Sequence, residues 1–480
     1  MSIPPTVVEI ATASLMVIVL LADLLSPRSK TPVWACFLAG SAVILALAVA
    51  ARGDLLLFGG SYAADDLSWL SKIVIVIGTG LAGALSMASR SEAASAVPVK
   101  QKYHGAYAAL LLAAAVGMMV LVSSRELVTL YVGLETSAVS LYGLAALAKK
   151  DDLSLEAGIK YLVIGALSSG VLLYGLALVY TATGSTSLDG IRSALAGHAP
   201  VPIVVAGILL VLLGVGFKLS MVPMHVWAPD VYQGAPTPVS AFISVVSKSA
   251  GFVFAIRLFS VAFVDLRSWW EPFVMGGAVL TMTVGNLAAI PQASAKRLLA
   301  YSSISQAGYL LVGFLGTASS AASSVLFYLF VYTLTNVAAF GAVIAFSSAT
   351  GSDRLEDYNG LARRDPVLAL VFTFALLSLA GIPPLGGFIG KLYLFSAAME
   401  QGYLWLVVVA ALNSVVSLYY YLLVLRRMYI AESPAGAGPL KVAFPVKAVL
   451  LFTTVGVFWL GILPGSLMRI LSEASARVFP

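Results

Sequence analysis

Four lysines lie near the middle of long apolar stretches, where a charged side chain is costly: Lys160, Lys218, Lys248 and Lys391. On the insertion scale an ionisable group at mid-span costs about 2.5–3.5 kcal/mol, so the four together would cost about 10–14 kcal/mol. Such groups mark ion or proton pathways, or they neutralise a carboxylate and lock two helices. Both interpretations stay open for each lysine. Lys160, close to a span's end, could also extend its side chain to the membrane interface.

Glu135 is the only carboxylate well inside an apolar stretch, in Tyr131-Val-Gly-Leu-Glu-Thr-Ser137. A buried carboxylate needs a cationic partner, and a lysine on a neighbouring helix, such as Lys218, is the natural one. At an effective dielectric near 20, opposite charges about 4 Å apart attract by about 4 kcal/mol. Making and breaking such a pair changes how firmly the lysine holds its proton. We therefore predict a coupled pair of Glu135 and Lys218 that takes part in proton transfer.

A break in the helix is predicted just after Lys218, in Gly216-Phe-Lys-Leu-Ser-Met-Val-Pro-Met-His225-Val-Trp227. Pro223 has no N–H for the carbonyl of Leu219, and its ring clashes there. A broken helix at membrane depth is tolerated only where it lines a cavity or is buried in protein. His225, beyond the break, is a candidate proton carrier. Its alternative role is to hydrogen-bond the freed carbonyls.

A second break is predicted at Gly381-Ile-Pro-Pro-Leu-Gly-Gly387, two helical turns before Lys391. Counted from His104, Pro223 comes 119 residues in, and counted from Arg267, Pro383 comes 116 residues in. Each proline falls in the fourth span of a five-span set. Because five is odd, the second set starts on the opposite side of the membrane, as in the inverted repeats of translocating proteins.

Small hydroxyl residues surround Lys248, in Ser244-Val-Val-Ser-Lys-Ser249. They indicate a hydrated groove around the lysine, or merely close packing of two helices. The sequence leaves both possibilities open.

The composition requires a membrane around these groups. Of 480 residues, 60% are hydrophobic and only 10% are charged, whereas soluble domains carry about 25% charged residues. We expect an all-α polytopic membrane protein with about fourteen transmembrane helices, two inverted five-helix repeats and two broken helices. A span needs about 20 mainly apolar residues, and the candidates are 6–25, 32–51, 66–88, 103–123, 126–147, 157–181, 201–224, 238–262, 270–290, 297–316, 322–348, 366–398, 403–429 and 445–466.

Four units follow from this count. Residues 1–100 hold helices 1–3, residues 101–265 the first repeat (helices 4–8), residues 266–430 the second repeat (helices 9–13), and residues 431–480 the C-terminal helix 14.

The loops after odd-numbered spans carry sixteen lysines and arginines, and the opposite side carries six. By the positive-inside rule the odd-numbered loops lie in the cytoplasm and both termini outside. The remaining six basic residues lie inside predicted spans: Lys72, Lys160, Lys218, Lys248, Arg257 and Lys391.

The residue counts exclude several kinds of site. A single cysteine, Cys36, forms neither an internal disulfide nor a thiolate cluster. Three widely spaced histidines are too few for a zinc or haem site. The net charge of +6 is spread between apolar runs, so no nucleic-acid partner is expected. The chain should bind no redox cofactor of its own.

Four long motifs stand out along the chain: Trp227-Ala-Pro-Asp-Val-Tyr-Gln-Gly-Ala-Pro-Thr-Pro-Val-Ser-Ala-Phe242 with Ser247-Lys248, Lys296-Arg-Leu-Leu-Ala-Tyr-Ser-Ser303, Val331-Tyr-Thr-Leu-Thr-Asn336 and Gly381–Lys391. They resemble motifs of the antiporter-like subunits of respiratory complex I, the proton-pumping NADH:quinone oxidoreductase. The resemblance covers about residues 100–430, and earlier residues fit only in span count. Val231-Tyr-Gln-Gly-Ala-Pro236 and the absence of a long lateral helix after the last span favour the subunit N type.

The resemblance implies fourteen helices, with helices 4–8 and 9–13 as inverted units. It implies a Glu135–Lys218 pair, a central Lys248 and an outer Lys391, and Lys160 matches a further lysine. One departure is Gln306, where many relatives carry histidine. The resemblance also implies a bacterial inner membrane and partners among the other membrane-arm subunits. FMN, iron–sulfur clusters and quinone would be bound by other subunits.

Two rival functions remain. A subunit of a multi-subunit cation/proton antiporter would share these helices, and the proteins with which the chain co-purifies would tell the two apart. A stand-alone secondary transporter would require a more varied polar cavity.

Overall fold

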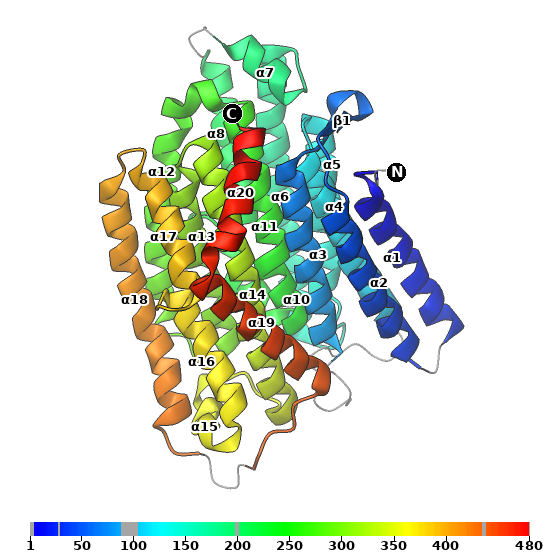
Figure 1. The fold of residues 1–480 in the computed structure, drawn as a ribbon, viewed down its shortest axis with the longest axis vertical. Helices are drawn as coiled ribbons and strands as arrows, with labels where there is room; N and C mark the ends of the chain where they lie inside the picture. The colour runs from blue at the N-terminus through cyan, green and yellow to red at the C-terminus, as the bar shows by residue number, and fades with distance from the viewer. Residues whose placement is uncertain (1–3, 27–28, 88–103, 197–200, 434–437, 480) are drawn as a thin grey trace.

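The structure is a bundle of long helices whose two chain ends lie at the same end of the bundle (Figure 1). It is a computed structural model that describes residues 4–26, 29–87, 104–196, 201–433 and 438–479. We call the end with both termini the terminal end. The opposite end carries α15. A chain whose ends meet on one side crosses the bundle an even number of times, as predicted.

Twelve segments of the described chain are long and apolar enough to span a membrane. They are α1 (Val7–Leu25), α2 (Thr31–Ala50), α3 (Asp66–Ser86), α4 (His104–Ser123), α5 (Leu127–Ala145), α6 (Asp152–Thr183), α8 (Pro202–Leu219), the continuous segment of α10 (Thr237–Phe242), η2 (Ile243–Ser247) and α11 (Lys248–Val261), α12 (Arg267–Ala289), α14 (Ala318–Thr350), α18 (Leu404–Tyr429) and α19 (Phe444–Ile462).

The two further crossings of the predicted fourteen fall on segments of the described chain that are not among these twelve. The helix α13 (Ala295–Phe314) has the required length, but two basic residues and several serines lower its hydropathy. The other crossing is made of two shorter helices, α16 (Pro366–Ala380) and α17 (Gly386–Met399), separated by the predicted second break. The division into two inverted repeats stays a prediction, and its boundary at residue 100 lies outside the described residues.

The remaining elements lie at the ends of the bundle or along it. They are β1 (Leu55–Leu57), η1 (Phe58–Gly60), β2 (Tyr62–Ala64), α7 (Leu188–Leu195), α9 (Trp227–Gly234), η3 (Val264–Leu266), η4 (Leu355–Tyr358), α15 (Leu361–Arg364) and α20 (Pro464–Val478). The strands β1 and β2 pair as a short antiparallel hairpin. The prediction of an all-α fold is therefore correct except for this hairpin, which the sequence analysis did not predict.

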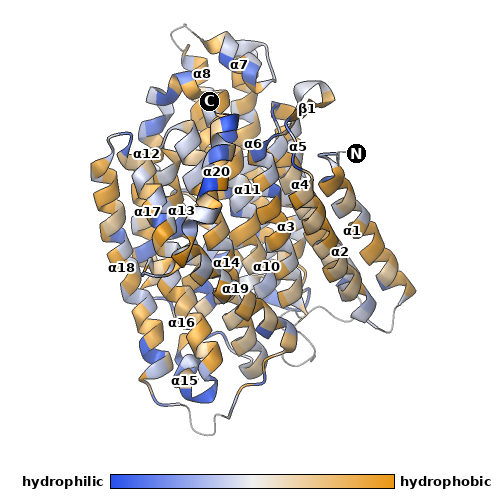
Figure 2. Cartoon of the chain, in the orientation of Figure 1, coloured by the Kyte–Doolittle hydropathy of each residue, from blue (hydrophilic) through white to orange (hydrophobic). Residues whose placement is uncertain are grey.

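The segment α10–η2–α11 forms the centre of the bundle, because all of its apolar window is buried, whereas α1, α2, α18 and α19 bury about a third of theirs. Apolar residues cover the outer helices, and hydrophilic residues gather on α7 and α20 at one end and α15 at the other (Figure 2). This distribution matches a protein surrounded by lipid, with polar groups left at the two interfaces.

Candidate functional site

Both predicted helix breaks are present, and each lies beside a buried lysine. The helix α8 ends at Leu219, and Ser220 adopts a left-handed conformation before the proline. Lys218 stands in the last turn of α8 and is 5% exposed. The helix α16 ends in the same way at Ala380, before the left-handed Gly381.

The second break supplies a hydrogen-bond acceptor to Lys391, in α17. Ending α16 frees the carbonyl oxygens of its last turn. Lys391 Nζ donates to the carbonyl oxygen of Ala380 at 3.1 Å and to Ser414 Oγ at 3.2 Å. It also lies 4.2 Å from the centre of the Tyr309 ring. A cation at the carboxyl end of a helix is favoured by the helix dipole, so the break itself provides a place for this charge.

Lys248 begins α11 directly after η2, a π-helical turn that the sequence analysis did not predict. Its side chain is 1% exposed. Nζ donates to Ser303 Oγ at 2.6 Å and to the Ser303 carbonyl oxygen at 2.5 Å. Single π-helical turns recur at functional sites in other proteins.

A cluster of hydroxyl and amide groups continues from Ser303. Tyr332 OH donates to Ser303 Oγ at 2.8 Å, and Asn336 Nδ2 donates to Tyr332 OH at 3.0 Å. The same amide nitrogen donates to Ser244 Oγ at 2.8 Å. Buried networks of this kind hold their members in defined positions.

Gln306 lies one turn after Ser303 on α13. Its Nε2 donates to the carbonyl oxygen of Leu379 at 2.9 Å, and its Oε1 accepts from Tyr328 OH at 2.5 Å. Leu379 is next to Ala380, the acceptor of Lys391. An amide has a fixed donor and acceptor and does not titrate, so this position differs chemically from a histidine.

Glu135 and Lys218 are close but do not touch. Within the described chain no direct ion pair joins them. Lys218 Nζ donates to Ser137 Oγ at 3.2 Å, while Glu135 accepts a short hydrogen bond from Ser169. Ser169 and Lys218 both line a cavity of about 20 Å³, enough for about one water. The pair is thus arranged for coupling through space or through a water.

Lys160 lies apart from these buried groups. It forms ion pairs with Glu156 at 2.6 Å and with Asp230 at 2.7 Å, and its side chain is 40% exposed. Asp230 also pairs with Arg297 at 2.9 Å. Burial acts to raise the pKa of Asp230, but hydrogen bonds from Lys160 and Arg297 outweigh it and lower the pKa.

His225 is half-buried beside the first break. Its ring hydrogen-bonds the backbone of Pro223, and its Nδ1 is buried without a partner in the described chain. The backbone bond matches the alternative role considered for it, and the free nitrogen keeps a proton-carrying role possible.

The sequence analysis missed a buried carboxylate on the first helix. Glu9 on α1 is 9% exposed and pairs with Lys72 on α3 at 2.9 Å. Nearby, Asp65 and Arg257 form a bidentate pair at 2.7 Å for each contact. The sequence analysis counted Lys72 and Arg257 inside spans but looked for no partners. A search for acidic residues near the edges of neighbouring spans would have suggested both ion pairs.

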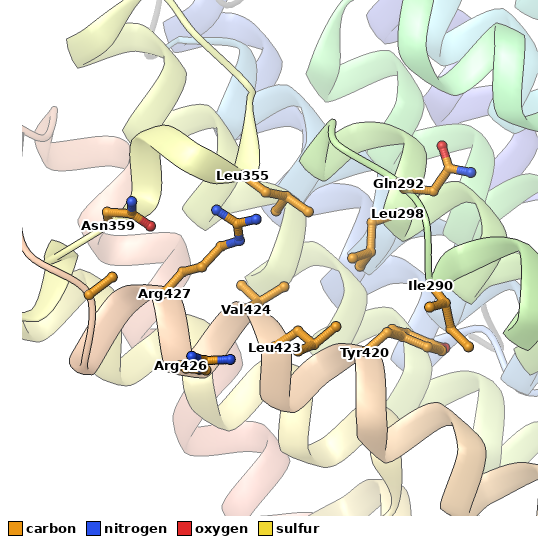
Figure 3. A pocket seen from close by; sticks show the side chains of 11 residues that line it. Ile290, Gln292, Leu298, Leu355, Asn359, Tyr420, Leu423, Val424, Arg426 and Arg427 are labelled. Carbon is orange, nitrogen blue, oxygen red and sulfur yellow. The ribbon is translucent and has the colours of Figure 1, made fainter.

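A further cavity lies elsewhere, between the ends of α12 and α18, η4 and the start of α13 (Figure 3). Its volume is about 360 Å³, and Arg426, Arg427 and Tyr420 are among its walls. None of the site residues proposed from the sequence lines it.

In the described part of the chain, no three His, Cys, Asp or Glu side chains gather as metal ligands do.

Comparisons with known proteins cover nearly the whole chain. A family model described as NADH:quinone oxidoreductase/Mrp antiporter, transmembrane, matches residues 124–417. NADH-quinone oxidoreductase subunit N of Moorella thermoacetica is 43% identical over 98% of this chain and 98% of its own length. A chain of respiratory complex I from Thermus thermophilus is 34% identical, with a TM-score of 0.79, covering 95% of this chain and 98% of that one. A chain of the Mrp complex from a Dietzia species has a TM-score of 0.85 at 23% identity, covering 99% of this chain and 98% of that one, and shares the fold.

Proposed function

The chain belongs to the NADH:quinone oxidoreductase/Mrp antiporter family, and within it to the subunit N group, and on that premise we propose that it translocates protons in the membrane arm of a respiratory complex I. Electron transfer to quinone, through FMN and iron–sulfur clusters, would take place in other subunits. The proposed partners are the other membrane-arm subunits. The proposed location is a bacterial inner membrane, with both termini outside the cytoplasm.

One observation carries the proposal: three residues spaced by three on α13 contact successive parts of a buried polar row. Ser303 accepts from Lys248, Gln306 donates to the last turn of α16, and the ring of Tyr309 lies against Lys391. Residues three apart share one face of a helix. All three are fully buried. One helix face therefore aligns the two lysines, and waters would complete the row between its members.

The roles of the site residues follow from their positions. Lys248 and Lys391 would hold and release protons along the row, and Glu135 would tune Lys218 at its start. His225 would exchange protons at the first break. Lys160 has the weakest support, since its partners form a partly exposed ion-pair cluster.

The inverted repeats at 101–265 and 266–430 are proposed because both breaks end a helix on a left-handed residue before proline.

A multi-subunit cation/proton antiporter is not favoured. The likeness to the Dietzia Mrp chain is one of fold, at 23% identity, whereas subunit N of Moorella thermoacetica is 43% identical over 98% of the chain. The cavity lined by Ser169 and Lys218 holds about one water rather than a solute.

The test is reconstitution of the purified complex in liposomes, with quinone reduction and internal acidification measured together. Lys248→Met should abolish or strongly reduce the protons moved per electron pair. Lys296→Met is the matched control, because Lys296, at the start of α13, also binds a carbonyl oxygen, that of Ala235 at 2.9 Å, away from the row. Normal pumping by the Lys248 variant would overturn the proposal.

A further inference from the structure

Three ionisable side chains meet at the terminal end of the bundle, outside the residues that the family model matches. Tyr62 OH donates to Glu9 Oε1 at 2.5 Å, and Lys72 Nζ donates to Tyr62 OH at 2.7 Å. Lys72 Nζ also lies 2.9 Å from Glu9 Oε1. The side chains of Lys72 and Glu9 are 4% and 11% exposed. The hydroxyl of Tyr62 thus bridges an acid and a base that already touch.

The second carboxylate oxygen of this cluster has no hydrogen-bond partner. Glu9 Oε2 is buried, and nothing in the described chain donates to it. A buried acceptor without a donor costs about 1–3 kcal/mol, and more when the group is charged. A pair that served only to lock α1 to α3 would be expected to satisfy both oxygens. A proton delivered to the Glu9 carboxylate would remove the negative charge that this unpartnered oxygen shares.

A small cavity reaches the cluster from the terminal end. Its volume is about 10 Å³, close to the space that one water needs. Lys72, Asp65 and Ser68 line its inner wall, and Pro5 and Gly53 line the wall near the chain's outer loops. A water there would stand between Lys72 and the solvent.

The charged neighbours of the cluster are already paired. Asp65 binds Arg257 through both carboxylate oxygens, and it accepts from the Ser68 N–H at the start of α3. Burial acts to raise the pKa of Asp65, but the charge and hydrogen bonds of Arg257 and those of Ser68 lower it. Asp66 pairs with Arg52 and Arg477. The exchangeable proton therefore belongs to the cluster rather than to these pairs.

We infer that Glu9, Tyr62 and Lys72 form a second proton-binding site, which exchanges protons with the solvent at the terminal end. In the transfer, an N–H bond of Lys72 breaks and its proton joins the Tyr62 oxygen, while the former Tyr62 proton binds Glu9. The products are a neutral lysine, an unchanged tyrosine and a neutral glutamic acid, so atoms and charge balance.

The Asp65–Arg257 pair, which lies beside the site, is connected to the lysine row by a single helix. Arg257, the partner of Asp65, is on α11, which begins at Lys248. The two residues are nine positions apart on the helix, about 14 Å at 1.5 Å per residue. The inference rests on the proposed function, because a proton site has a role here only if the chain moves protons.

The test compares double variants in the intact complex. Glu9→Gln with Lys72→Met removes the pair without leaving an unpaired buried charge, a change that is often neutral for stability. The matched control is Asp23→Asn with Lys30→Met, which removes a pair at 3.0 Å near the opposite end of α1. Tyr62→Phe keeps the direct ion pair and removes only the bridging hydroxyl.

Infrared difference spectra across pH supply a readout that a structural lock would not move. We expect a protonated-carboxyl band that is lost in Glu9→Gln and present in the Asp23/Lys30 control. In liposomes, Tyr62→Phe should slow proton release about tenfold or more, since positioned proton-transfer groups contribute about 10²–10⁴-fold. A spectrum with no band assignable to Glu9, or unchanged proton release in Tyr62→Phe, would overturn the inference.

Lys391→Met, measured in parallel, separates this inference from the proposed function. If Lys391→Met pumps normally, the proposed function fails. If Lys391→Met stops pumping while the Glu9/Lys72 double variant pumps like the wild type, only the second site fails, and the pair is a helix lock.

Discussion

Lys391 forms a hydrogen bond across the break in its own span: its Nζ donates to the carbonyl oxygen of Ala380, the last residue of α16, at 3.1 Å. A continuous helix would have used that oxygen for its own backbone bonds. The break therefore provides a neutral acceptor for a buried cation that has no carboxylate partner in the described chain. A neutral acceptor holds the ammonium in place without an ion pair.

Replacing Lys391 tests this arrangement. Lys391→Met should lower the protons moved per electron pair by about tenfold or more, as expected for loss of a positioned proton carrier. Assembly should survive, because a buried charge leaves together with its hydrogen bonds to Ala380 and Ser414. Acidification of liposomes containing the complex measures the effect, and a failure to assemble would favour a role in holding the break together.

Glu135 and Lys218 should be coupled despite the absence of direct contact. Glu135→Gln removes the charge that acts on Lys218, so it should reduce pumping far more than Glu135→Asp, which keeps it. Ser137→Ala removes the hydroxyl bound to Lys218 at 3.2 Å and should have an intermediate effect. Pumping ratios of the three variants are the measurement. Equal losses in Glu135→Gln and Glu135→Asp would show that shape, and not charge, matters at this position.

Gln306 offers a test of how protons pass the middle of the row. Gln306→Leu leaves Tyr328 and the Leu379 carbonyl without their partner, at a cost of about 1–3 kcal/mol, and should reduce pumping. Gln306→His replaces a neutral amide by a titratable group, so pumping should acquire a new pH dependence. The measurement is proton translocation by the wild type and by Gln306→His from about pH 5.5 to about pH 8, the range in which histidines commonly titrate. A flat profile in Gln306→His would place the protons' route elsewhere.

The buried pair of Asp65 and Arg257 should stabilise the N-terminal helices strongly. Asp65→Asn keeps a residue that caps helices well, but it leaves the Arg257 charge buried without its carboxylate. The free energy of unfolding should therefore fall by about 3–5 kcal/mol. Asp265→Asn is the control, since its pair with Arg192 spans 3.6 Å and both side chains are about half exposed, a class worth about 0–1 kcal/mol. Thermal unfolding of the purified complex compares them, and equal effects would contradict the prediction.

The same pair predicts a pH dependence. The pKa of Asp65 is lower in the folded chain than the ordinary value of 3.8. Its stabilisation is therefore complete above that value and is lost as the pH falls through the lower, folded value. The difference in stability between wild type and Asp65→Asn should thus shrink only below about pH 4.

The orientation in the membrane gives one further expected outcome. In a Cys36→Ser background, a membrane-impermeant thiol reagent should label Glu356→Cys only from the cytoplasmic side and Ser193→Cys only from the other side. Ser193 is on α7, whereas Glu356 is in η4, just before α15, and α7 and α15 lie at opposite ends of the bundle (Figure 1). Labelling of Glu356→Cys from outside would reverse the proposed orientation.

The sequence by itself determined the membrane class, most of the membrane-spanning helices and the two breaks. These features are local, since about 20 apolar residues suffice to span lipid and proline lacks the N–H that a helix needs. It also identified Lys218, Lys248 and Lys391 as buried cations, because their neighbours in the chain are apolar. The π-helical turn before Lys248 and the β1–β2 hairpin had no comparable local pattern.

Only the tertiary structure decided which groups these cations meet. Lys248 meets Ser303 from 55 positions away, and Lys160 meets Asp230 from 70 positions away. Glu9 and Lys72 touch although neither lies near the other in the chain. Such contacts depend on how each helix is rotated and how closely it packs, and both are set by the summed fit of many side chains. A single sequence shows which groups are buried, but packing determines which of them lie within hydrogen-bonding distance.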